Sequence, residues 1–260
     1  MIRFLRSVPI LDEACSYRFP SLDGASAEGI VCAGGNLSPG ILLSAYRQGI
    51  FPWYGEGEPI LWWSPEPRFA VLPETLHISA SASKLLRCHP FRLTIDQAFG
   101  KVIASCAYIP RQGQDGTWIV PDMIEAYNKL HELGFAHSVE VWDDDTLVGG
   151  LYGIGLGSAF FGESMFSVKS GASRVGFLCF AMALFENGFE LIDSQVYTDY
   201  LGGMGGVELP RNLYLGRLEH ALRMPDLKGT WNGAFPGFPI TEALSQITSP
   251  GRRTIDRGKP

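Results

Sequence analysis

Two short segments place polar side chains that could take part in chemistry inside otherwise apolar stretches. In segment 162–166, Glu163 comes directly after an apolar run. A carboxylate in such surroundings must be exposed, paired with a cation or used functionally, because burial without a partner is costly. If segment 189–196 is a strand, Asp193 and Gln195 lie on one face, after two apolar residues. Polar groups at the end of an apolar strand face commonly line a pocket, although both could instead bond to neighbouring backbone.

Aromatic side chains form a third candidate group, because aromatic rings can stack on nucleotide bases. The residues concerned are Trp53, Tyr54, Trp62, Trp63, Trp118 and Tyr127. Such rings also commonly belong to a core or to an interface between subdomains, and both interpretations stay open. The glycine-rich stretch 202–206 lacks the Gly-Lys-Ser/Thr ending of a P-loop, which favours a turn over a phosphate site.

The composition indicates a folded protein and limits its class. Of the 260 residues, 46% are hydrophobic and 18% charged, which is ordinary for a globular protein and unlike a disordered one. The net charge of −6 argues against a globally basic, nucleic-acid-coating surface but permits a local basic face. The N-terminus has no signal-peptide pattern, and no apolar run approaches the ~20 residues of a membrane-spanning helix. We therefore expect a soluble, cytoplasmic protein without a membrane partner.

The cysteines are odd in number and scattered along the chain, which favours reduced thiols over disulfides. They are Cys15, Cys32, Cys88, Cys106 and Cys179. The neighbours Cys88 and His89 could begin a metal site, but no second pair follows at the spacing of a zinc finger. We therefore expect no metal.

The elements that must position these residues can be predicted from caps and periodicity. Ser38 suits an N-cap, Pro39 a first helical position and Gly49 a stop, which together predict a short helix. Three prolines in 59–68 favour extended or turning chain. The later predicted elements are a strand over 91–95, helices over 96–107 and 121–134, a hairpin of 136–142 and 147–154, a strand near 158–162, a helix over 172–185 and a strand over 189–196.

This order, several antiparallel strands followed by a buried helix and another strand, is a coarse match to α+β folds of the acetyltransferase type. We expect a small N-terminal domain over 1–66 and a catalytic domain over 67–240. The remaining segment, 241–260, contains few apolar residues and is expected to be a mobile tail.

Several strings in the chain are long and unusual. They include Phe-Pro-Trp at 51–53, Trp-Trp-Ser-Pro-Glu-Pro-Arg at 62–68, Gly-Glu-Ser-Met-Phe-Ser at 162–167 and Leu-Ile-Asp-Ser-Gln at 191–195. From about residue 30 to residue 220, their order and spacing resemble the leucyl/phenylalanyl-tRNA–protein transferase family. The resemblance implies a small N-terminal domain joined to an acetyltransferase-like (GNAT-type) catalytic domain. It also implies transfer of Leu, Phe or sometimes Met from aminoacyl-tRNA to acceptor proteins with N-terminal Arg or Lys, which marks them for degradation as N-degrons.

The resemblance further implies roles for individual residues. Asp193 and Gln195 match the proposed catalytic pair of the family. In this interpretation Gln195 orients the acceptor amine, while Asp193 fixes Gln195 and stabilises the cationic amine. Glu163 matches a pocket position and could attract the basic acceptor. The other implied substrate-binding residues are Trp53 and Trp118 for the terminal adenosine, Leu151, Phe160, Met165, Leu184 and Ile192 for the aminoacyl side chain, and Tyr127.

The implied reaction, aminolysis of an ester, needs no organic cofactor and no metal. Its partners would be Leu- or Phe-tRNA and an acceptor protein with a basic N-terminus, and we expect the enzyme to act as a monomer. Where the family usually shows His-x-x-Ser-Leu-Gly-Ala, this chain has Tyr-Leu-Gly-Gly-Met-Gly-Gly at 200–206. Positions 171 and 174 also depart from the family pattern. These departures leave the acceptor preference and the rate open.

Two other functions remain alternatives. An acyl-CoA-dependent N-acyltransferase of the same fold class would need a pyrophosphate-binding loop that opens a helix, and no such loop is found at the expected place. A non-catalytic tRNA-binding protein would be expected to have lost Asp193, Gln195 or the apolar pocket, and all of these are present.

Overall fold

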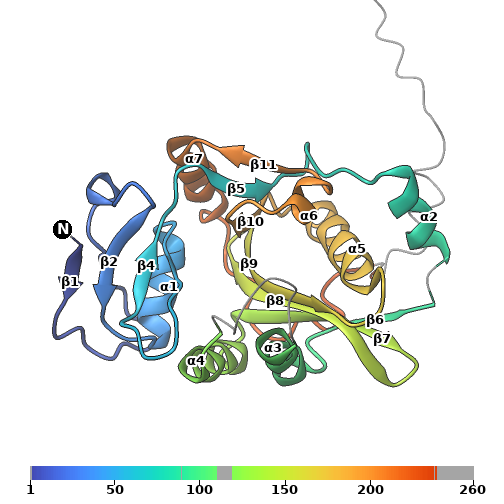
Figure 1. Ribbon diagram of the computed structural model, residues 1–260, viewed down its shortest axis with the longest axis horizontal. Helices are drawn as coiled ribbons and strands as arrows, with labels where there is room; N and C mark the ends of the chain where they lie inside the picture. Colours follow the sequence, from blue (N-terminus) through green and yellow to red (C-terminus); the bar gives the residue numbers. More distant parts are fainter. Residues whose placement is uncertain (1, 89, 110–118, 237, 239–260) are drawn as a thin grey trace, which may run out of the picture.

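The computed structural model describes residues 2–88, 90–109, 119–236 and 238, which form two β-sheets with helices packed between and around them (Figure 1). The smaller sheet has the strand order β1-β2-β4-β3, and β1 and β2 are parallel neighbours. Its strands are β1 (Arg3–Leu5), β2 (Ile30–Gly34), β3 (Phe51–Pro52) and β4 (Leu61–Trp63). A 3-10 turn, η1 (Leu22–Gly24), and helix α1 (Pro39–Arg47) complete this part of the chain.

The larger sheet has the order β11-β5-β10-β9-β8-β7-β6. Its strands are β5 (Arg68–Val71), β6 (Arg92–Ile95), β7 (Ala136–Asp143), β8 (Thr146–Leu156), β9 (Ala159–Ser167), β10 (Leu191–Gln195) and β11 (Gly206–Leu209). Strands β9 and β10 run parallel, whereas the other neighbouring pairs are antiparallel. Strand β5 comes early in the chain yet lies between the two last strands, so the first and last thirds of the protein share one sheet.

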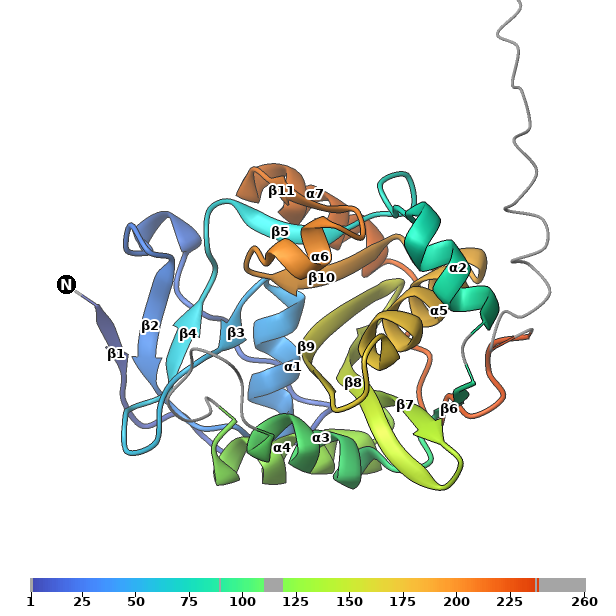
Figure 2. The same cartoon turned by 45° about the vertical axis from the view of Figure 1, so that its right-hand side comes forward.

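Helices cover both faces of the larger sheet, with α5 and α2 on one side and α3 and α4 on the other (Figures 1 and 2). The bounds are α2 (Ala80–Cys88), α3 (Phe99–Tyr108), α4 (Pro121–Glu132), α5 (Ala172–Glu186), α6 (Asp199–Gly202) and α7 (Arg211–Ala221). Almost every side chain of α5 is buried. A helix that is apolar all round requires cover on all sides, which the sheet and α2 supply.

Helix α1 begins and ends where its sequence predicts. Pro39 opens it, and the chain leaves it through Gly49, whose φ of 73° lies in the left-handed region that glycine tolerates. Ser38 occupies the N-cap position, but its hydroxyl accepts a hydrogen bond from the Leu11 N–H rather than from the helix. The Ser38 side chain therefore holds the N-terminal segment against α1 instead of capping it.

The expected α+β class is confirmed by these two sheets. The hairpin of β7 and β8 and the buried helix α5 also lie where they were expected, whereas β9 runs five residues further than predicted, to Ser167. All five cysteines are free thiols. Among the described residues, no group of His, Cys, Asp and Glu side chains could hold a metal, and no helix is long and apolar enough to cross a membrane. The expected tail, 241–260, lies outside the described residues.

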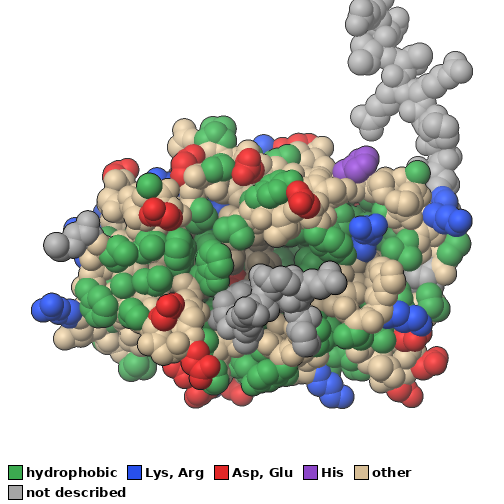
Figure 3. Space-filling model, viewed as in Figure 1, with side chains coloured by type: hydrophobic (Ala, Val, Ile, Leu, Met, Phe, Trp, Pro, Cys, Tyr) green, Lys and Arg blue, Asp and Glu red, His purple; other side chains and the backbone are tan. Residues whose placement is uncertain are grey.

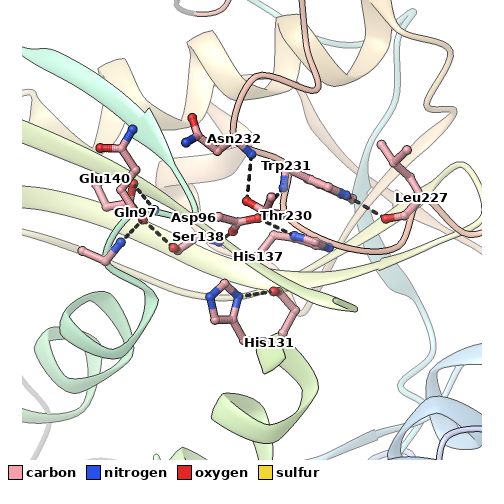
Figure 4. Close-up of polar contacts among 12 residues, drawn as sticks. Asp96, Gln97, His131, His137, Ser138, Glu140, Leu227, Thr230, Trp231 and Asn232 are labelled. Atoms are coloured by element: carbon pink, nitrogen blue, oxygen red, sulfur yellow. Dashed lines mark hydrogen bonds and ion pairs between the residues drawn. The ribbon is translucent and has the colours of Figure 1, made fainter. Parts of the chain in front are cut away.

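The last described segment is fastened to the sheet through Trp231 (Figure 4). The Trp231 N–H donates to Asp96 Oδ2 (2.7 Å), which also accepts from His137 Nδ1 (2.9 Å), and the Trp231 ring stacks on the His137 ring at 3.6 Å. Burial lowers the pKa of His137, so its ring is neutral near pH 7 and donates through Nδ1. Phe160 and Phe180 also lie against the Trp231 ring. The segment therefore packs against the aromatic side chains of the core.

Candidate active site

A pocket opens where β9 and β10 stop pairing. Their parallel ladder covers three residue pairs and ends at Asp193 and Phe161, whereas β9 continues to Ser167 beside β8 alone. Beyond the ladder, the side chains of Glu163 and Gln195 bridge the gap, with Gln195 Nε2 donating to Glu163 Oε1 at 2.7 Å. The two segments that the sequence marks as chemically unusual therefore meet at one place.

The pocket has a volume of about 510 Å³, within the usual range for a small-molecule site. Its walls come from β3, β8, β9, β10, α5 and α6 and combine an apolar interior with a few polar groups. The apolar lining includes Phe51, Leu151, Phe160, Met165, Phe177, Phe180, Ile192 and Leu201. The face shown in Figure 3 is hollowed near its centre, with apolar side chains around the hollow and most charged ones further out.

Glu163 is the carboxylate of this pocket, and it is 7% exposed. Its partners are neutral donors: Tyr46 OH to Oε1 (2.7 Å), Tyr127 OH to Oε2 (2.8 Å) and the Gln195 amide. No Lys, Arg or His among the described residues forms an ion pair with it, so the structural ion pair considered from the sequence is not found. Burial raises the pKa of Glu163 to about 7, although the hydrogen bonds from Tyr46 and Tyr127 oppose this effect. Near pH 7, a small change in the surroundings of Glu163 can therefore change whether its carboxyl group is ionised.

Asp193 and Gln195 do not share a strand face, contrary to the prediction from alternation. The register of β10 shifts between them, and Gln195 has a φ of 64°, in the left-handed region that few non-glycine residues adopt. This turn directs the Gln195 side chain into the pocket. Asp193 is 0% exposed and does not line the pocket. Regular alternation fails here because a bulge interrupts the pleat.

The carboxylate of Asp193 is enclosed by three donors. Arg68 binds it through Nε to Oδ1 (2.8 Å) and Nη2 to Oδ2 (2.7 Å), Tyr214 OH donates to Oδ2 (2.7 Å), and the Gln195 N–H donates to Oδ1 (2.9 Å). Burial by itself would lower the pKa of Arg68, but the charge of Asp193 outweighs it and the pKa is raised. Arg68 and Asp193 thus form a buried ion pair behind the pocket wall.

The structure brings together most of the residues that the resemblance singles out. Trp53, Leu151, Phe160, Glu163, Met165, Ile192 and Gln195 all line the pocket. Tyr127 is fully buried and reaches the site through its hydroxyl on Glu163. Leu184 is fully buried in α5 and does not line the pocket, because its position near the end of the helix lies deeper in the core. Trp118 lies outside the described residues.

Several residues of the site were missed from the sequence. Phe177 and Phe180 line the pocket from α5, where a helix that is apolar throughout gives no sign of which residues face a cavity. Tyr46 lies in α1 among apolar residues, and that pattern gives no sign that its hydroxyl belongs to a site. Arg68 carried a usable signal, since it is a cation that directly precedes the apolar residues 69–71 at the start of a strand.

The segment that departs from the family pattern forms part of the pocket rim. Tyr200 of α6 lines the pocket, and its hydroxyl lies 2.8 Å from the Ser173 Oγ in α5. The Arg174 guanidinium lies over the Tyr200 ring. Among the glycines that follow, Gly205 has a φ of 100°, and a Cβ there would lie 2.0 Å from the Thr75 carbonyl oxygen. The glycine-rich stretch is therefore a tight connection into β11, as the turn interpretation predicted.

Comparison with known proteins identifies relatives over most of the chain. The profile of the leucyl/phenylalanyl-tRNA protein transferase family matches residues 70–219, and that of its N-terminal domain matches residues 35–66. A protein from Anaeromyxobacter sp. (strain Fw109-5) is 52% identical over 82% of this chain and 91% of its own length. A protein from Desulfatibacillum aliphaticivorans is 50% identical over 85% of this chain and 94% of its own. Both are named leucyl/phenylalanyl-tRNA–protein transferase.

Solved structures give weaker likenesses. L-PGS from Bacillus licheniformis matches 62% of this chain and 54% of its own, with 10% identity and a TM-score of 0.36. A GCN5-related N-acetyltransferase from Kribbella flavida matches 66% of this chain and 62% of its own, with 11% identity and a TM-score of 0.34. These scores are too low to carry an argument, so the assignment rests on the profiles and the sequence relatives. The chain belongs to the leucyl/phenylalanyl-tRNA–protein transferase family and is an aminoacyltransferase.

Proposed function

We propose that this enzyme moves leucine or phenylalanine, and sometimes methionine, from aminoacyl-tRNA to acceptor proteins that begin with Arg or Lys. The observation that carries the proposal is the junction of an apolar pocket with the Glu163–Gln195 pair at its polar end. Membership of the family supports the same conclusion. The product would carry a new N-terminal Leu or Phe, which marks it for degradation. Since charged tRNA is cytoplasmic, we place the enzyme there, and we propose that it acts as a monomer.

The apolar part of the pocket suits an unbranched or γ-branched side chain. Phe160 and Phe180 pack edge to face at 4.9 Å, and the Trp231 ring contacts both of them. These contacts hold the two side chains in place at the apolar end of the pocket. Met165 is half-buried at the wall, and its flexible thioether can adapt to ligands of different shape. A charged or strongly polar aminoacyl group would lose its hydration there without gaining partners. Leucyl and phenylalanyl groups would instead bury apolar surface.

Trp53 supports recognition of the tRNA end. Its indole lines the pocket and is 39% exposed, although Trp63 packs beside it at 5.5 Å. An indole held by a neighbouring ring and still open to solvent is suited to stack on a base, at about 1–3 kcal/mol. We therefore assign Trp53 to the terminal adenosine, next to the ester that must react.

The acceptor would approach the polar end of the pocket. Glu163 has no cationic partner among the described residues, so a cation of the acceptor would supply one and would favour the ionised carboxylate. Because the pKa of Glu163 is about 7, the charge available to a basic N-terminus increases through neutral pH. An acidic N-terminal residue would be repelled. This charge preference supports Arg and Lys as acceptors.

The chemistry requires positioning more than activation. An α-amine has a pKa of about 7.7–8.0, so part of it is already neutral at pH 7. Its nitrogen attacks the ester carbonyl, the C–N bond forms, and the C–O bond to the tRNA ribose breaks. The amine proton leaves with the ribose oxygen, which becomes a hydroxyl again. Gln195 is too weak a base to remove that proton, so we assign it to orienting the amine and the carbonyl.

The test is transfer of labelled Leu or Phe from charged tRNA to four peptides that differ in the first residue, which is Arg, Lys, Asp or Glu. We expect labelling of the Arg and Lys peptides alone. A Gln195→Ala enzyme should transfer at a rate lower by about tenfold or more, and it provides the matched negative control. Equal labelling of all four peptides would refute the acceptor preference. The absence of any labelling by the folded enzyme would refute the proposed reaction.

A further inference from the structure

Asp193 has no direct access to a substrate. Its side chain is 0% exposed, it does not line the pocket, and both of its oxygens accept hydrogen bonds from protein donors. A carboxylate in this position cannot contact an acceptor amine. Any effect of Asp193 on transfer must therefore pass through a neighbouring residue.

That neighbour is Gln195, whose backbone conformation is unusual. Its left-handed φ of 64° carries a steric cost in a residue that has a Cβ. The Gln195 N–H donates to Asp193 Oδ1 at 2.9 Å, and a bond from an aspartate to the backbone two residues on is a common way of stabilising such a turn. The same turn directs the Gln195 amide to Glu163 at 2.7 Å. Asp193 thus holds the turn that directs the amide.

Asp193 is itself held by residues from two other elements. Arg68 of β5 grips both carboxylate oxygens, and its guanidinium lies between the rings of Phe51 and Tyr214, 4.7 Å from each. Arg68 Nη1 also donates to the Gly49 carbonyl at the end of α1 (3.3 Å). Tyr214 of α7 adds a hydroxyl to Asp193 Oδ2. The carboxylate is therefore fixed from β5 and α7, and through Arg68 it is tied to the N-terminal part of the chain.

Such an arrangement is poorly explained by stability. A buried ion pair is commonly no more stabilising than well-packed apolar residues of the same volume, because both charges lose their hydration. Three protein donors on one buried carboxylate do, however, define its position closely. The value of the pair must then lie in what the fixed carboxylate positions.

We infer that Arg68 and Tyr214 are positioning residues for aminoacyl transfer, which act through Asp193 to hold the Gln195 amide at the reacting groups. The inference rests on the proposed function and extends it to residues outside the pocket. Loss of the Tyr214 hydroxyl loosens Asp193, which loosens the turn at Gln195 and moves its amide. Binding of the aminoacyl side chain to the apolar walls is untouched.

The most selective perturbation is Tyr214→Phe, because it removes one hydroxyl and keeps the ring over Arg68. We expect kcat for transfer from Phe-tRNA to fall by about tenfold, since small displacements of a positioning group have large effects on rate, while KM stays within about twofold. The matched control is Tyr54→Phe. Tyr54 is also buried, at 8% exposure against 0% for Tyr214, and its hydroxyl has no hydrogen-bond partner in the part of the chain that the structure describes. This control should behave like the unmodified enzyme.

A double-mutant cycle separates positioning from general damage. If Tyr214 acts through Gln195, then Tyr214→Phe should cost nothing further in a Gln195→Ala enzyme, because the group that it positions is gone. If the two losses multiply, Tyr214 acts independently of Gln195 and the inference is overturned.

A spectroscopic measurement keeps the inference testable without turnover. With 15N-labelled glutamine, the side-chain amide signal of Gln195 is assigned by its disappearance in Gln195→Ala. We expect this signal to shift in Tyr214→Phe and to stay in place in Tyr54→Phe. A signal that Tyr214→Phe leaves unmoved overturns the inference. If the unmodified enzyme transfers to no peptide, the proposed function fails, whereas the amide signal still decides whether Tyr214 positions Gln195.

Discussion

Replacement of Glu163 by glutamine should change how the stability of the enzyme depends on pH. Burial raises the pKa of the folded carboxyl from an ordinary 4.5 to about 7, so the folded state favours the protonated form. The stabilising contribution of that form is complete below pH 4.5 and is lost as the pH rises through about 7. A Glu163→Gln enzyme carries an uncharged amide at all pH values, so its stability does not lose this contribution as the pH rises.

The magnitude follows from the width of this window. At about 1.4 kcal/mol per pH unit, the interval from 4.5 to about 7 corresponds to roughly 3 kcal/mol. The difference in free energy of unfolding, unmodified enzyme minus Glu163→Gln, should therefore fall by about 3 kcal/mol between pH 4.5 and pH 8. The altered hydrogen bonds to Tyr46, Tyr127 and Gln195 offset this difference by an amount that does not depend on pH.

Urea denaturation followed by tryptophan fluorescence at half-unit steps of pH measures both curves. Subtraction removes the contributions of other titrating groups, His137 included, because they are common to the two proteins. A matched Glu125→Gln enzyme, changed at an exposed position of α4, controls for loss of a negative charge that is not buried. Parallel curves for the unmodified and Glu163→Gln enzymes would refute the assignment of a raised pKa to Glu163.

The remaining predictions concern the aromatic core and the pocket. Trp231→Ala should lower the free energy of unfolding by about 3–5 kcal/mol, as measured by urea denaturation, because it removes a fully buried ring from the His137 and Phe180 contacts; a loss below about 1 kcal/mol would contradict this. Gly155→Ala should cost about 1–3 kcal/mol in the same assay, because its Cβ would lie 2.5 Å from the Trp231 ring, and the cost should disappear when Trp231→Ala is also present. Leu151→Trp should fill the apolar end of the pocket and lower kcat/KM for Phe-tRNA by about tenfold or more, with an unchanged kcat/KM as the contrary result.

Local signals predicted the elements that depend on local causes. The proline and glycine at the ends of α1, the apolar stripe of α4 and the alternation of β7 and β8 each act within a few residues, and each element formed where it was expected. The resemblance to the family also predicted several of the residues that line the pocket. In both cases the information lies close along the chain to the feature that it predicts.

The site details that the sequence did not predict depend on contacts between distant segments. Alternation placed Asp193 and Gln195 on one face, but a bulge held by the side chain of Asp193 separates them. Burial raises the pKa of Glu163, and the hydroxyls that oppose this effect come from α1 and α4. Arg68 gained a role only when its partner, 125 residues later, came to lie beside it. No pattern within a short window contains such information.

The position of β5 in the larger sheet has a consequence for how the enzyme is made. Strand β5 pairs with β10 and β11, so it has no neighbour in the sheet until residues beyond 190 have been synthesised. Closing the long loop between β5 and β10 is slow, because the chain loses conformational entropy before any stabilising contact between the two strands forms. Until β10 is in place, Arg68 lacks its partner Asp193, and an unpaired cation opposes the burial of the apolar residues beside it. We therefore expect the fixed carboxylate, and with it transfer activity, to be the last property that the folding chain acquires.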